Sequence, residues 1–557
     1  MSKLALNIQS TSTGFLAAAD HLEAHETDPE RMWERQANLE LATKLREQNA
    51  AEKLASAQQD VVVKDAAAQV AALALDSRSE STDILHDLFR GDDILKVAHT
   101  AHGGNHFVAA RDVKAGEHLI LGLCPEVAAP LWPCSRAEHR ASTTSELDAE
   151  QEWAFLRRAP GPKPPADDVD DESEVRRSTS AYWLLALRVA RRALHEPPYR
   201  QAAMALQCGP HAESDRAFLR GCGEMLSGGL SGALTADDCA QLLGAIHLNT
   251  LGTRATLGGA MEGVCLSTRA SLFNHSCDPN VHFHTGSPET DGAMTFRAMR
   301  PIAAGEACTI SYVDAAEPAY VRRRRLKLTK LFDCRCAVCV APCEAGALQC
   351  DRCGGGWLSQ AADAAPDGDG CWTCSRCGAQ TAHSEVLAWD LELRKTLAEL
   401  EELPPSEAGY AGLTQRALSR CHPNHGFVLQ ARLTLLARCY PGTRQDVTSA
   451  AKKLGAAEAA LSLALRILPP YDEQVGDLHY QIGSACNTLA AAHRSAGRAA
   501  DAAGQWKRAA GALLESRRQF TFCSRAREAK AAGEFAAVCM RQLKSSPPCE
   551  LKALPKP

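Results

Sequence analysis

The sequence of 557 residues predicts an α+β protein, in which a unit of small β-sheets is interrupted by a helical insert and followed by a helical domain. Two stretches, after Val97 and around Met294–Tyr312, share the order strand, Ala-Gly turn, strand. Nine of the 23 cysteines fall between Cys334 and Cys377. Beyond His383 the patterning is almost entirely helical. At roughly 100–200 residues per domain, these contrasts indicate several domains.

The composition excludes several classes of protein. With 45% hydrophobic residues, 23% charged residues and a net charge of -6, the chain reads as globular, without the basic excess typical of nucleic-acid binding. The apolar stretches are far shorter than the ~20 residues of a membrane span. No compact apolar segment precedes Asp20, so we expect no secretory signal and a cytoplasmic or nuclear location, or both. Clustered cysteines in such a compartment favour metal binding over disulfides.

The N-terminal part is expected to be helical up to the first strands. Residues 1–95 carry few glycines or prolines and form either a partner-binding arm or a solvated leader. The β-unit is expected over residues 96–315, with a helical insert at about 180–245. Residues 160–177 are rich in proline and then in acids, which predicts a loop.

Three motifs follow one another in the second half of the β-unit and beyond it. The first is Asn274-His275-Ser276-Cys277-Asp278-Pro279-Asn280, the second is GEACTISYVD, which contains Tyr312, and the third is LFDCRCAVC at 331–339. Upstream, HGGNHFVAARDVKAGE supplies the first strands and HLNTLG contains Asn249. In order and spacing these motifs resemble SET-domain protein methyltransferases of the SET and MYND-domain family. The resemblance runs from Val97 to Leu391 and implies a SET β-fold of small sheets with a post-SET zinc segment over 316–345.

The resemblance implies transfer of a methyl group from S-adenosylmethionine (SAM) to a protein lysine, with Tyr312 as the catalytic tyrosine. A free lysine has a pKa near 10.4, so the site has to favour the neutral amine by desolvation. The residues implied to contact the cofactor are Gly103, Gly104, Asn105, His106, Asn249, Ser271, Asn274, His275 and Phe332. In this sequence Gly104-Asn105-His106 stands where the family commonly has Gly-x-Gly, a departure that bears on how the methionine end of SAM is held.

Two zinc sites are predicted. Cys334, Cys336 and Cys339 supply three thiolates, and by the resemblance Cys277 supplies the fourth of a closed structural site. A zinc ribbon is predicted over 346–382 from the spacing of its pairs, which are Cys350-x-x-Cys353 and Cys374-x-x-Cys377, with Cys343 and Cys371 as alternative ligands. Because the ribbon carries several acids and few bases, a scaffold role is expected rather than direct nucleic-acid binding. The cysteines between the first strands and the insert are too scattered for a MYND finger.

The C-terminal region and the basic run leave alternatives open. Residues 383–545 are expected to form a helical domain, followed by a tail at 546–557. Five residues match the large and small positions of a tetratricopeptide helix pair, although a plain helical bundle fits as well: Leu489, Gly497, Ala502, Trp506 and Ala509. The run Arg322-Arg323-Arg324-Arg325-Leu326-Lys327 is either a nuclear localisation signal or phosphate patch, or one face of a helix.

The resemblance implies a SAM-dependent methyltransferase that acts on a lysine of a histone or non-histone protein, with further protein partners at the helical C-terminal domain. The alternative is a catalytically weak SET-fold scaffold that binds partners through that domain. No membrane partner is expected.

Overall fold

The computed structural model describes the chain in segments: residues 84–85, 89, 92–100, 104–123, 126–130, 146–156, 158–159, 174–208, 213–253, 263–285, 293–340, 344–360, 371–442 and 446–545. Most of the expected N-terminal arm, the expected loop up to residue 173 and the tail lie outside these residues. Gly103 and Cys343 lie outside them as well.

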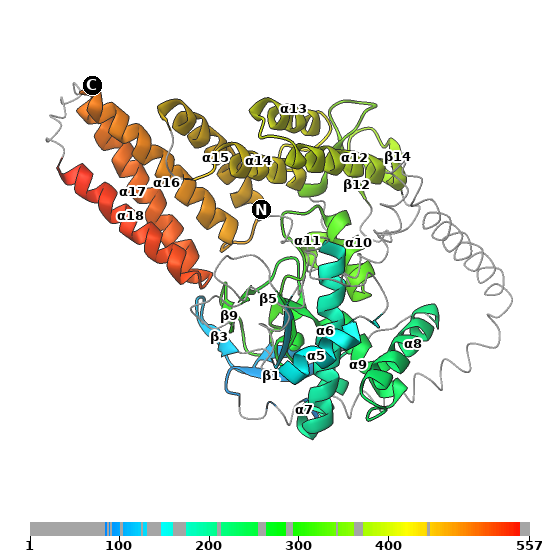
Figure 1. Cartoon of the computed structure of the whole chain (residues 1–557). Coiled ribbons are helices and arrows are strands. Elements are labelled where there is room, and N and C mark those ends of the chain that lie inside the picture. The colour runs from blue at the N-terminus through cyan, green and yellow to red at the C-terminus, as the bar shows by residue number, and fades with distance from the viewer. Residues whose placement is uncertain are drawn as a thin grey trace.

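The β-unit consists of small sheets (Figure 1). One antiparallel pair joins β1 (Leu95–Thr100) and β2 (Gly104–Ala109). In a first three-stranded antiparallel sheet, β9 (Met294–Ala298) lies between β3 (His118–Leu123) and β8 (Val281–His284). In a second, β6 (Gly263–Leu266) lies between β4 (Val127–Pro130) and β5 (Leu251–Thr253). The remaining pair is parallel and joins β7 (Asn274–His275) to β10 (Thr309–Ile310).

The two Ala-Gly turns noted in the sequence lie next to each other in space. Gly116 and Gly305 both have φ of +84°, a left-handed conformation that favours glycine. Val113 and Ile302, just before the turns, exchange two backbone hydrogen bonds of 2.9 Å. The repeated sequence pattern therefore builds one paired substructure.

Aromatic rings fill the centre of the β-unit. Phe273 lies between Phe296, stacked at 4.3 Å between ring centroids, and Phe107, edge-on at 5.2 Å. All three side chains are fully buried. Because Phe273 directly precedes the Asn274-His275 pair, this packing fixes the backbone from which the predicted site residues project.

The helical insert contains α5 (Glu146–Leu156), α6 (Glu174–His195), α7 (Pro197–Met204), α8 (Glu213–Gly229) and α9 (Ala236–Asn249). Residues 174–177, which we expected in the loop, are instead the first residues of α6. These residues are Glu-Val-Arg-Arg, and they follow the prolines and most of the acids on which the loop prediction depended. Helix α9 begins at its cap Thr235, whose hydroxyl accepts from the Asp238 N–H at 3.1 Å, and ends at Asn249.

The basic run forms part of α10 (Ala319–Lys330). Arg322 and Arg323 are each only 2% exposed, and Arg325 forms an ion pair with Glu317 at 2.9 Å. A signal or a phosphate patch requires exposed cations, so this burial favours the interpretation as a helix face.

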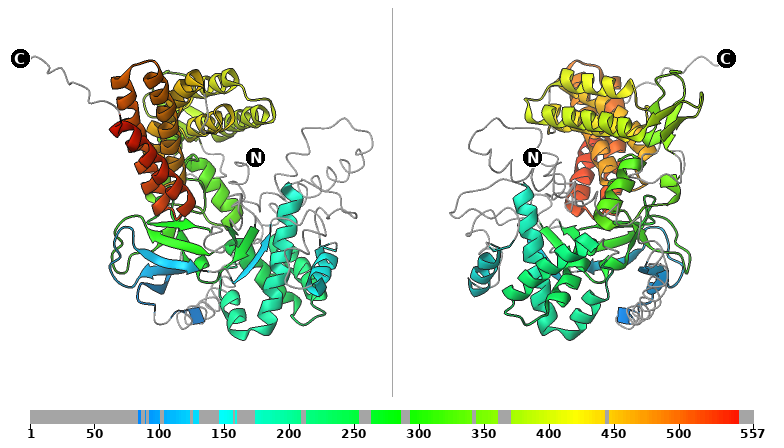
Figure 2. Two further views of the ribbon diagram at one scale, coloured as in Figure 1. Left: turned by 60° about the vertical axis from the view of Figure 1, so that its left-hand side comes forward. Right: turned by 90° about the vertical axis from the view of Figure 1, so that its right-hand side faces the viewer.

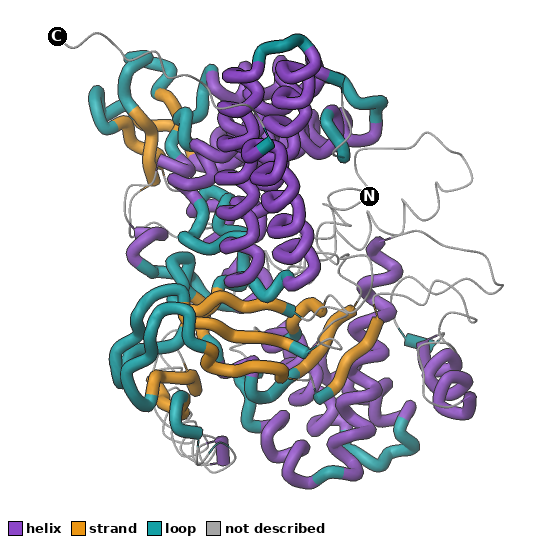
Figure 3. Tube along the Cα trace, turned by 90° about the vertical axis from the view of Figure 1, so that its left-hand side faces the viewer, coloured by secondary structure: helices purple, strands orange, loops and turns teal. Residues whose placement is uncertain are grey.

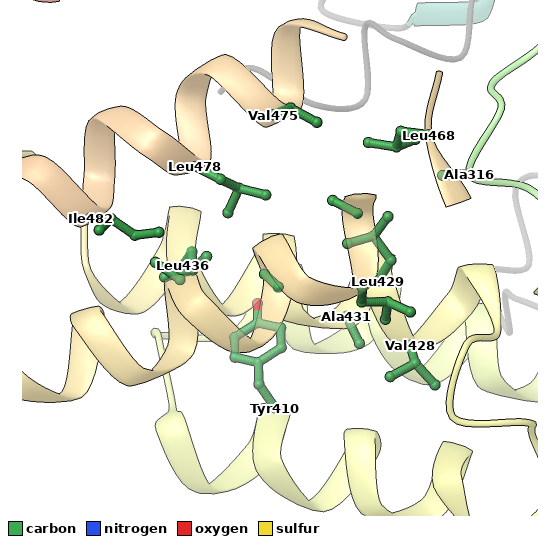
Figure 4. Packing of buried hydrophobic residues seen from close by; sticks show 14 of the residues in the cluster. Ala316, Tyr410, Val428, Leu429, Ala431, Leu436, Leu468, Val475, Leu478 and Ile482 are labelled. Carbon is green, nitrogen blue, oxygen red and sulfur yellow. The ribbon is translucent and has the colours of Figure 1, made fainter. Parts of the chain in front are cut away.

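A short helix and a small sheet follow: α11 (Ala337–Val340), then β11 (Leu348–Gln349), β12 (Trp357–Gln360), β13 (Cys371–Cys374) and β14 (Gln380–Ala382) in an antiparallel sheet. The C-terminal region is helical: α12 (His383–Glu402), α13 (Glu407–Leu418), α14 (Gly426–Cys439), α15 (Val447–Ile467), α16 (Glu473–Ser495), α17 (Ala499–Phe522) and α18 (Ala526–Lys544). Its core joins residues of successive helices, among them Tyr410, Leu436 and Leu478 (Figure 4).

Helices α16 and α17 contain the residues that matched a tetratricopeptide pair. Gly497 makes the turn with φ of +72°, and Ala502, Trp506 and Ala509 are buried. The pair therefore packs through the residues that the pattern singles out, while an array of such repeats stays a prediction.

The β-unit lies between the helical insert and the C-terminal helices (Figures 2 and 3). Arg297 of β9 bonds the carbonyls of Gly116 at 2.6 Å and of Thr521 at 3.1 Å, and its guanidinium stacks on Phe522. His284 of β8 lies 3.4 Å from Glu473 of α16. These contacts dock the ends of α16 and α17 on the sheet of β8 and β9. Among the described helices, none combines the length and the apolar character of a membrane span.

Candidate active site

The Asn274–Asn280 motif and the strand before Tyr312 are held together by one buried amide. The Asn280 Oδ1 accepts from the Thr309 N–H at 2.8 Å, and its Nδ2 donates to the Ala307 carbonyl at 2.8 Å and to Glu306 Oε1 at 3.0 Å. The side chain is 2% exposed, so these groups replace water. Asn280 thus fixes β10 beside β7 and sets where Tyr312 stands.

Replacing Asn280 by alanine is expected to lower the free energy of unfolding by about 2–4 kcal/mol, because this buried side chain is lost and its partly buried partners at Glu306, Ala307 and Thr309 lose their hydrogen bonds. Urea unfolding of both proteins measures the difference. The matched control is Asn424→Ala, whose amide bonds Glu344 at the surface and whose loss is expected to cost less than about 1 kcal/mol. Equal effects of the two substitutions would contradict the role given to Asn280.

Tyr312 is anchored at both its backbone and its hydroxyl. The hydroxyl donates to the Phe273 carbonyl at 2.6 Å, and the backbone N–H donates to His275 Nδ1 at 3.0 Å. Burial raises the pKa of Tyr312 above its usual value, so the phenol stays protonated at neutral pH. The ring and its hydroxyl are therefore held in one place as a neutral polar group.

His275 links Tyr312 to the cysteines. Since its Nδ1 accepts from a backbone N–H, the proton of the neutral ring is on Nε2. Burial lowers the pKa of His275 to about 4, which keeps the ring neutral. Its Nε2 lies 3.1 Å from the Cys277 sulfur and donates to it. One imidazole thus connects the tyrosine backbone with the predicted zinc ligand.

Of the side chains predicted to touch SAM, His106 is buried, and those near Tyr312 are partly exposed members of an otherwise buried region. Leu248, Thr250 and Phe273 are buried, whereas the predicted contacts beside them remain accessible in part. These contacts are Asn249, Ser271, Asn274, His275 and Phe332, and the predicted catalytic residue Tyr312 is partly exposed as well. The Phe332 ring lies 6.0 Å from that of His275. Amide groups and a flat apolar ring suit the amino-acid end and the adenine of SAM, so the residues fit this cofactor.

Gln207, which the sequence did not single out, joins the first turn to Asn249. Its carbonyl accepts from Asn249 Nδ2 at 2.8 Å, and its side-chain Oε1 faces the position where a Cβ on Gly104 would stand. Asn249 also donates to the Ala245 carbonyl, and the Ser271 hydroxyl reaches the Asn249 carbonyl at 3.4 Å. The structure therefore brings Gly104, Asn249 and Ser271 together. No local pattern marks Gln207, because its role comes from tertiary contact alone.

The Gly104-Asn105-His106 departure is accommodated within β2. Gly104 has φ of +59°, whereas Asn105 and His106 have ordinary strand conformations. The Asn105 side chain pairs with His99 across the hairpin at 2.9 Å, and the His106 ring contacts the Gly104 carbonyl at 3.0 Å. A glycine is thus conformationally needed at Gly104 and is present there, while the second glycine of the family pattern is not required by this backbone.

The first cysteine cluster brings together Cys277, Cys334, Cys336 and Cys339, whose sulfur atoms all lie within 4.8 Å of one another. Cys277 is 3.4 Å from Cys339 and 4.0 Å from Cys334 between sulfurs. Tetrahedral zinc with Zn–S bonds of ~2.3 Å separates its sulfurs by ~3.8 Å, so the spacing fits. The buried guanidinium of Arg322 lies 4.0 Å from the Cys339 sulfur and offsets thiolate charge.

The second cluster consists of Cys350, Cys353, Cys374 and Cys377, at the ends of the β11–β14 sheet. The Cys350–Cys377 and Cys353–Cys374 sulfur pairs are each 3.7 Å apart. Backbone N–H groups of Cys377 and Arg376 lower the pKa of Cys374 to about 6, which favours the thiolate that binds metal. Cys371 is exposed and outside this cluster. Within the described residues, these two sets are the thiol clusters with metal-ligand geometry.

Lys330, the last residue of α10, also lies at the site, although the sequence did not predict it there. Its Nζ donates to the Leu248 carbonyl at 2.7 Å and lies 5.4 Å from the centre of the Tyr312 ring. In the sequence it is one more cation after a basic run, and nothing there distinguishes it from solvated lysines.

Comparison with known proteins agrees with this geometry. Residues 104–313 match the family model of the SET domain. The chain is 40% identical to the mouse histone-lysine N-methyltransferase SMYD3 over 77 residues, 14% of this chain and 17% of that protein. It is 33% identical to mouse Smyd1 over 108 residues, 18% of this chain and 22% of that protein, and 37% identical to a SET and MYND domain-containing protein of Dictyostelium discoideum over 83 residues, 15% and 16% of the two chains.

The chain thus carries a SET domain, as the motifs predicted. Its similarity is to the SET and MYND domain-containing proteins, which include histone-lysine methyltransferases. The matched stretches span about a fifth or less of these relatives.

Proposed function

We propose that this protein is a SAM-dependent protein-lysine methyltransferase, with Tyr312 as its catalytic residue. The observation that carries the proposal is the anchored Tyr312 hydroxyl, held by the Phe273 carbonyl directly before the Asn274-His275 pair. SAM, when bound, supplies an activated methyl group on a sulfonium. Asn249, Ser271, Asn274, His275 and Phe332 are the residues proposed to hold it, with Gly104, Asn105 and His106 at its methionine end.

The protein's own contribution to the reaction is to position the substrate amine in a site largely shielded from water. Displacement at a methyl group needs a neutral amine in line with the sulfonium, and no covalent bond to the protein. The Tyr312 hydroxyl donates its proton to the Phe273 carbonyl, so its oxygen accepts an N–H of the substrate lysine and leaves the amine lone pair directed at the methyl group, while the buried surroundings disfavour the ammonium form. Zinc in the two cysteine clusters is proposed to be structural, because four thiolates leave no open position for water.

The proposal extends to the substrate, the partners and the location of the protein. A protein lysine, in a histone or another protein, is the proposed acceptor, and the helical C-terminal domain is proposed to pack as tetratricopeptide-like pairs that bind further partners. The proposed location is cytoplasmic, nuclear or both. Because α16 and α17 dock beside β8 and β9, a bound partner would lie close to the SET domain.

Transfer of label from tritiated SAM to proteins of a cell lysate tests the function. We expect labelled bands with the wild-type chain and a loss of about 100-fold or more with Tyr312→Phe, since removal of one preorganised hydrogen-bonding group commonly costs that much. The matched control is Tyr410→Phe, because the Tyr410 hydroxyl also bonds a backbone carbonyl, that of Leu400, far along the helical domain. Its activity is expected to equal that of the wild type.

A chain that is folded, binds no SAM and labels nothing would contradict the methyltransferase proposal and favour the scaffold alternative. Calorimetry with SAM makes that distinction. Labelling that is unchanged in Tyr312→Phe would show that the hydroxyl does not take part.

A further inference from the structure

A lysine of the chain itself reaches the face of the proposed catalytic tyrosine. The Lys330 Nζ lies 5.4 Å from the Tyr312 ring centre, and it donates to the carbonyl of Leu248, which directly precedes Asn249. The amine therefore lies between Tyr312 and the end of α9. Both belong to the proposed site. Phe332, proposed to face the adenine, follows two residues later.

The residue that directly follows Lys330 has an unusual backbone conformation. Leu331 caps α10 in a left-handed conformation with φ of +61°. A bulky non-glycine residue rarely adopts this conformation, and such strain concentrates at functional sites. Lys330, just before Leu331, reaches the Tyr312 ring, and the Phe332 ring, just after it, lies 6.0 Å from the His275 ring, so both side chains face the same site.

The surroundings also favour the reactive form of this amine. Burial lowers the pKa of Lys330 to about 8. At pH 8 about half of such amines are neutral, against roughly one in 250 for a solvated lysine. Methyl transfer requires a neutral amine near the catalytic tyrosine, and the Lys330 amine lies over the Tyr312 ring.

We propose that Lys330 is a methyl acceptor within its own chain, modified at Nζ by the SET site that contains Tyr312. This inference rests on the proposed methyltransferase function. In the step, the lone pair of Lys330 Nζ forms the new N–C bond while the C–S bond of SAM breaks. The bonding pair returns to sulfur, which leaves S-adenosylhomocysteine, and the methylated ammonium releases one proton to solvent.

The chain offers a matched lysine for comparison. Lys453 of α15 is 2% exposed, donates to the Gly442 carbonyl at 2.7 Å and also has a pKa lowered by burial. It shares the desolvation and the carbonyl contact of Lys330 but lies in the helical domain, away from Tyr312. Methylation caused by a reactive buried amine alone would mark both lysines, whereas methylation by the SET site marks Lys330.

The test is mass spectrometry of the full-length chain after incubation with SAM and no other substrate. We expect the mass of at least one methyl group on Lys330, none on Lys453, and a rate about 100-fold or more lower in Tyr312→Phe. Because the acceptor is in the same chain, the rate per chain should not change on dilution. When wild type is mixed with a tagged Tyr312→Phe chain, the tagged chain should stay unmodified.

Several results would overturn the proposal. An unmodified Lys330 in a chain that labels lysate proteins would refute this inference alone and leave the proposed function standing. Methylation of the tagged Tyr312→Phe partner would show transfer between chains, and equal modification of Lys453 would show unspecific chemistry. A chain that binds no SAM would refute both proposals. Thermal unfolding of Tyr312→Phe confirms that its loss of modification does not reflect unfolding.

Discussion

Replacing Cys334 by alanine is expected to reduce bound zinc from two ions per chain to one and to lower the free energy of unfolding by about 3–5 kcal/mol. Cys334 is 4% exposed and shares its cluster with Cys277 of the Asn274–Asn280 motif. Structural zinc sites contribute directly to folding, and three ligands bind zinc far more weakly than four.

The loss should extend to the cofactor site. Cys277 accepts from His275, whose other nitrogen accepts from Tyr312, and Phe332 precedes Cys334 by two residues. Without zinc, neither His275 nor Phe332 is held in place by the cluster, so we expect SAM affinity to fall by about 10-fold or more. Elemental analysis measures the zinc, and calorimetry measures the affinity.

Cys308→Ala is the matched control for this substitution. Cys308 is fully buried in the β-unit and belongs to neither cluster, so its loss should cost about 1–2 kcal/mol and leave both zinc ions bound. Two zinc ions retained by Cys334→Ala would contradict the assignment. Zinc loss with unchanged SAM affinity would refute the coupling through His275 and Phe332.

Replacing Gly426 by alanine is expected to separate the helical domain from the segment after Tyr312, at a cost of about 3 kcal/mol or more. Gly426 is the first residue of α14, and a Cβ there would overlap the carbonyl oxygen of Ala316 and approach Pro318. Both partners are rigid, because one is backbone and the other is the proline that caps the start of α10. The clash is therefore relieved only by moving α14 away.

Gly412→Ala supplies the control in the neighbouring helix α13. A Cβ on Gly412 meets no atom within 4 Å, so alanine there should stabilise the helix by about 0.5–1 kcal/mol. Thermal unfolding and urea unfolding measure both variants. A Gly426→Ala protein as stable as the wild type would show that α14 does not pack on Ala316 as described.

Much of the site was predictable because its residues lie in short motifs with fixed local geometry. Asn274, His275 and Cys277 fall within four residues, and the Cys334, Cys336 and Cys339 spacing presents three thiols from one loop. The two Cys-x-x-Cys pairs of the second cluster indicate a metal site by their spacing in the same way. In each case the chemistry needs several groups from one short stretch of chain, so sequence spacing alone indicates it.

The residues that the sequence did not reveal act across long separations. Gln207 meets Asn249 across the helical insert, Lys330 reaches Leu248 from another helix, and Arg297 bonds Thr521 in the C-terminal domain. Nothing local distinguishes such a glutamine, lysine or arginine from the solvated ones. The extent of α6 was likewise misjudged, because acids before a helix predict a loop and a helix N-terminus equally well.

The sequence by itself determined the class of protein: its motifs, cysteine pairs and helical periodicity predicted a SET domain with two thiol clusters and a helical C-terminal region. The tertiary structure alone decided how these parts connect. It placed His275 between Tyr312 and Cys277, buried the basic run of α10, and brought Lys330 to the tyrosine. Local motifs encode chemistry in neighbouring residues, whereas burial and distance between remote segments arise only when the chain packs.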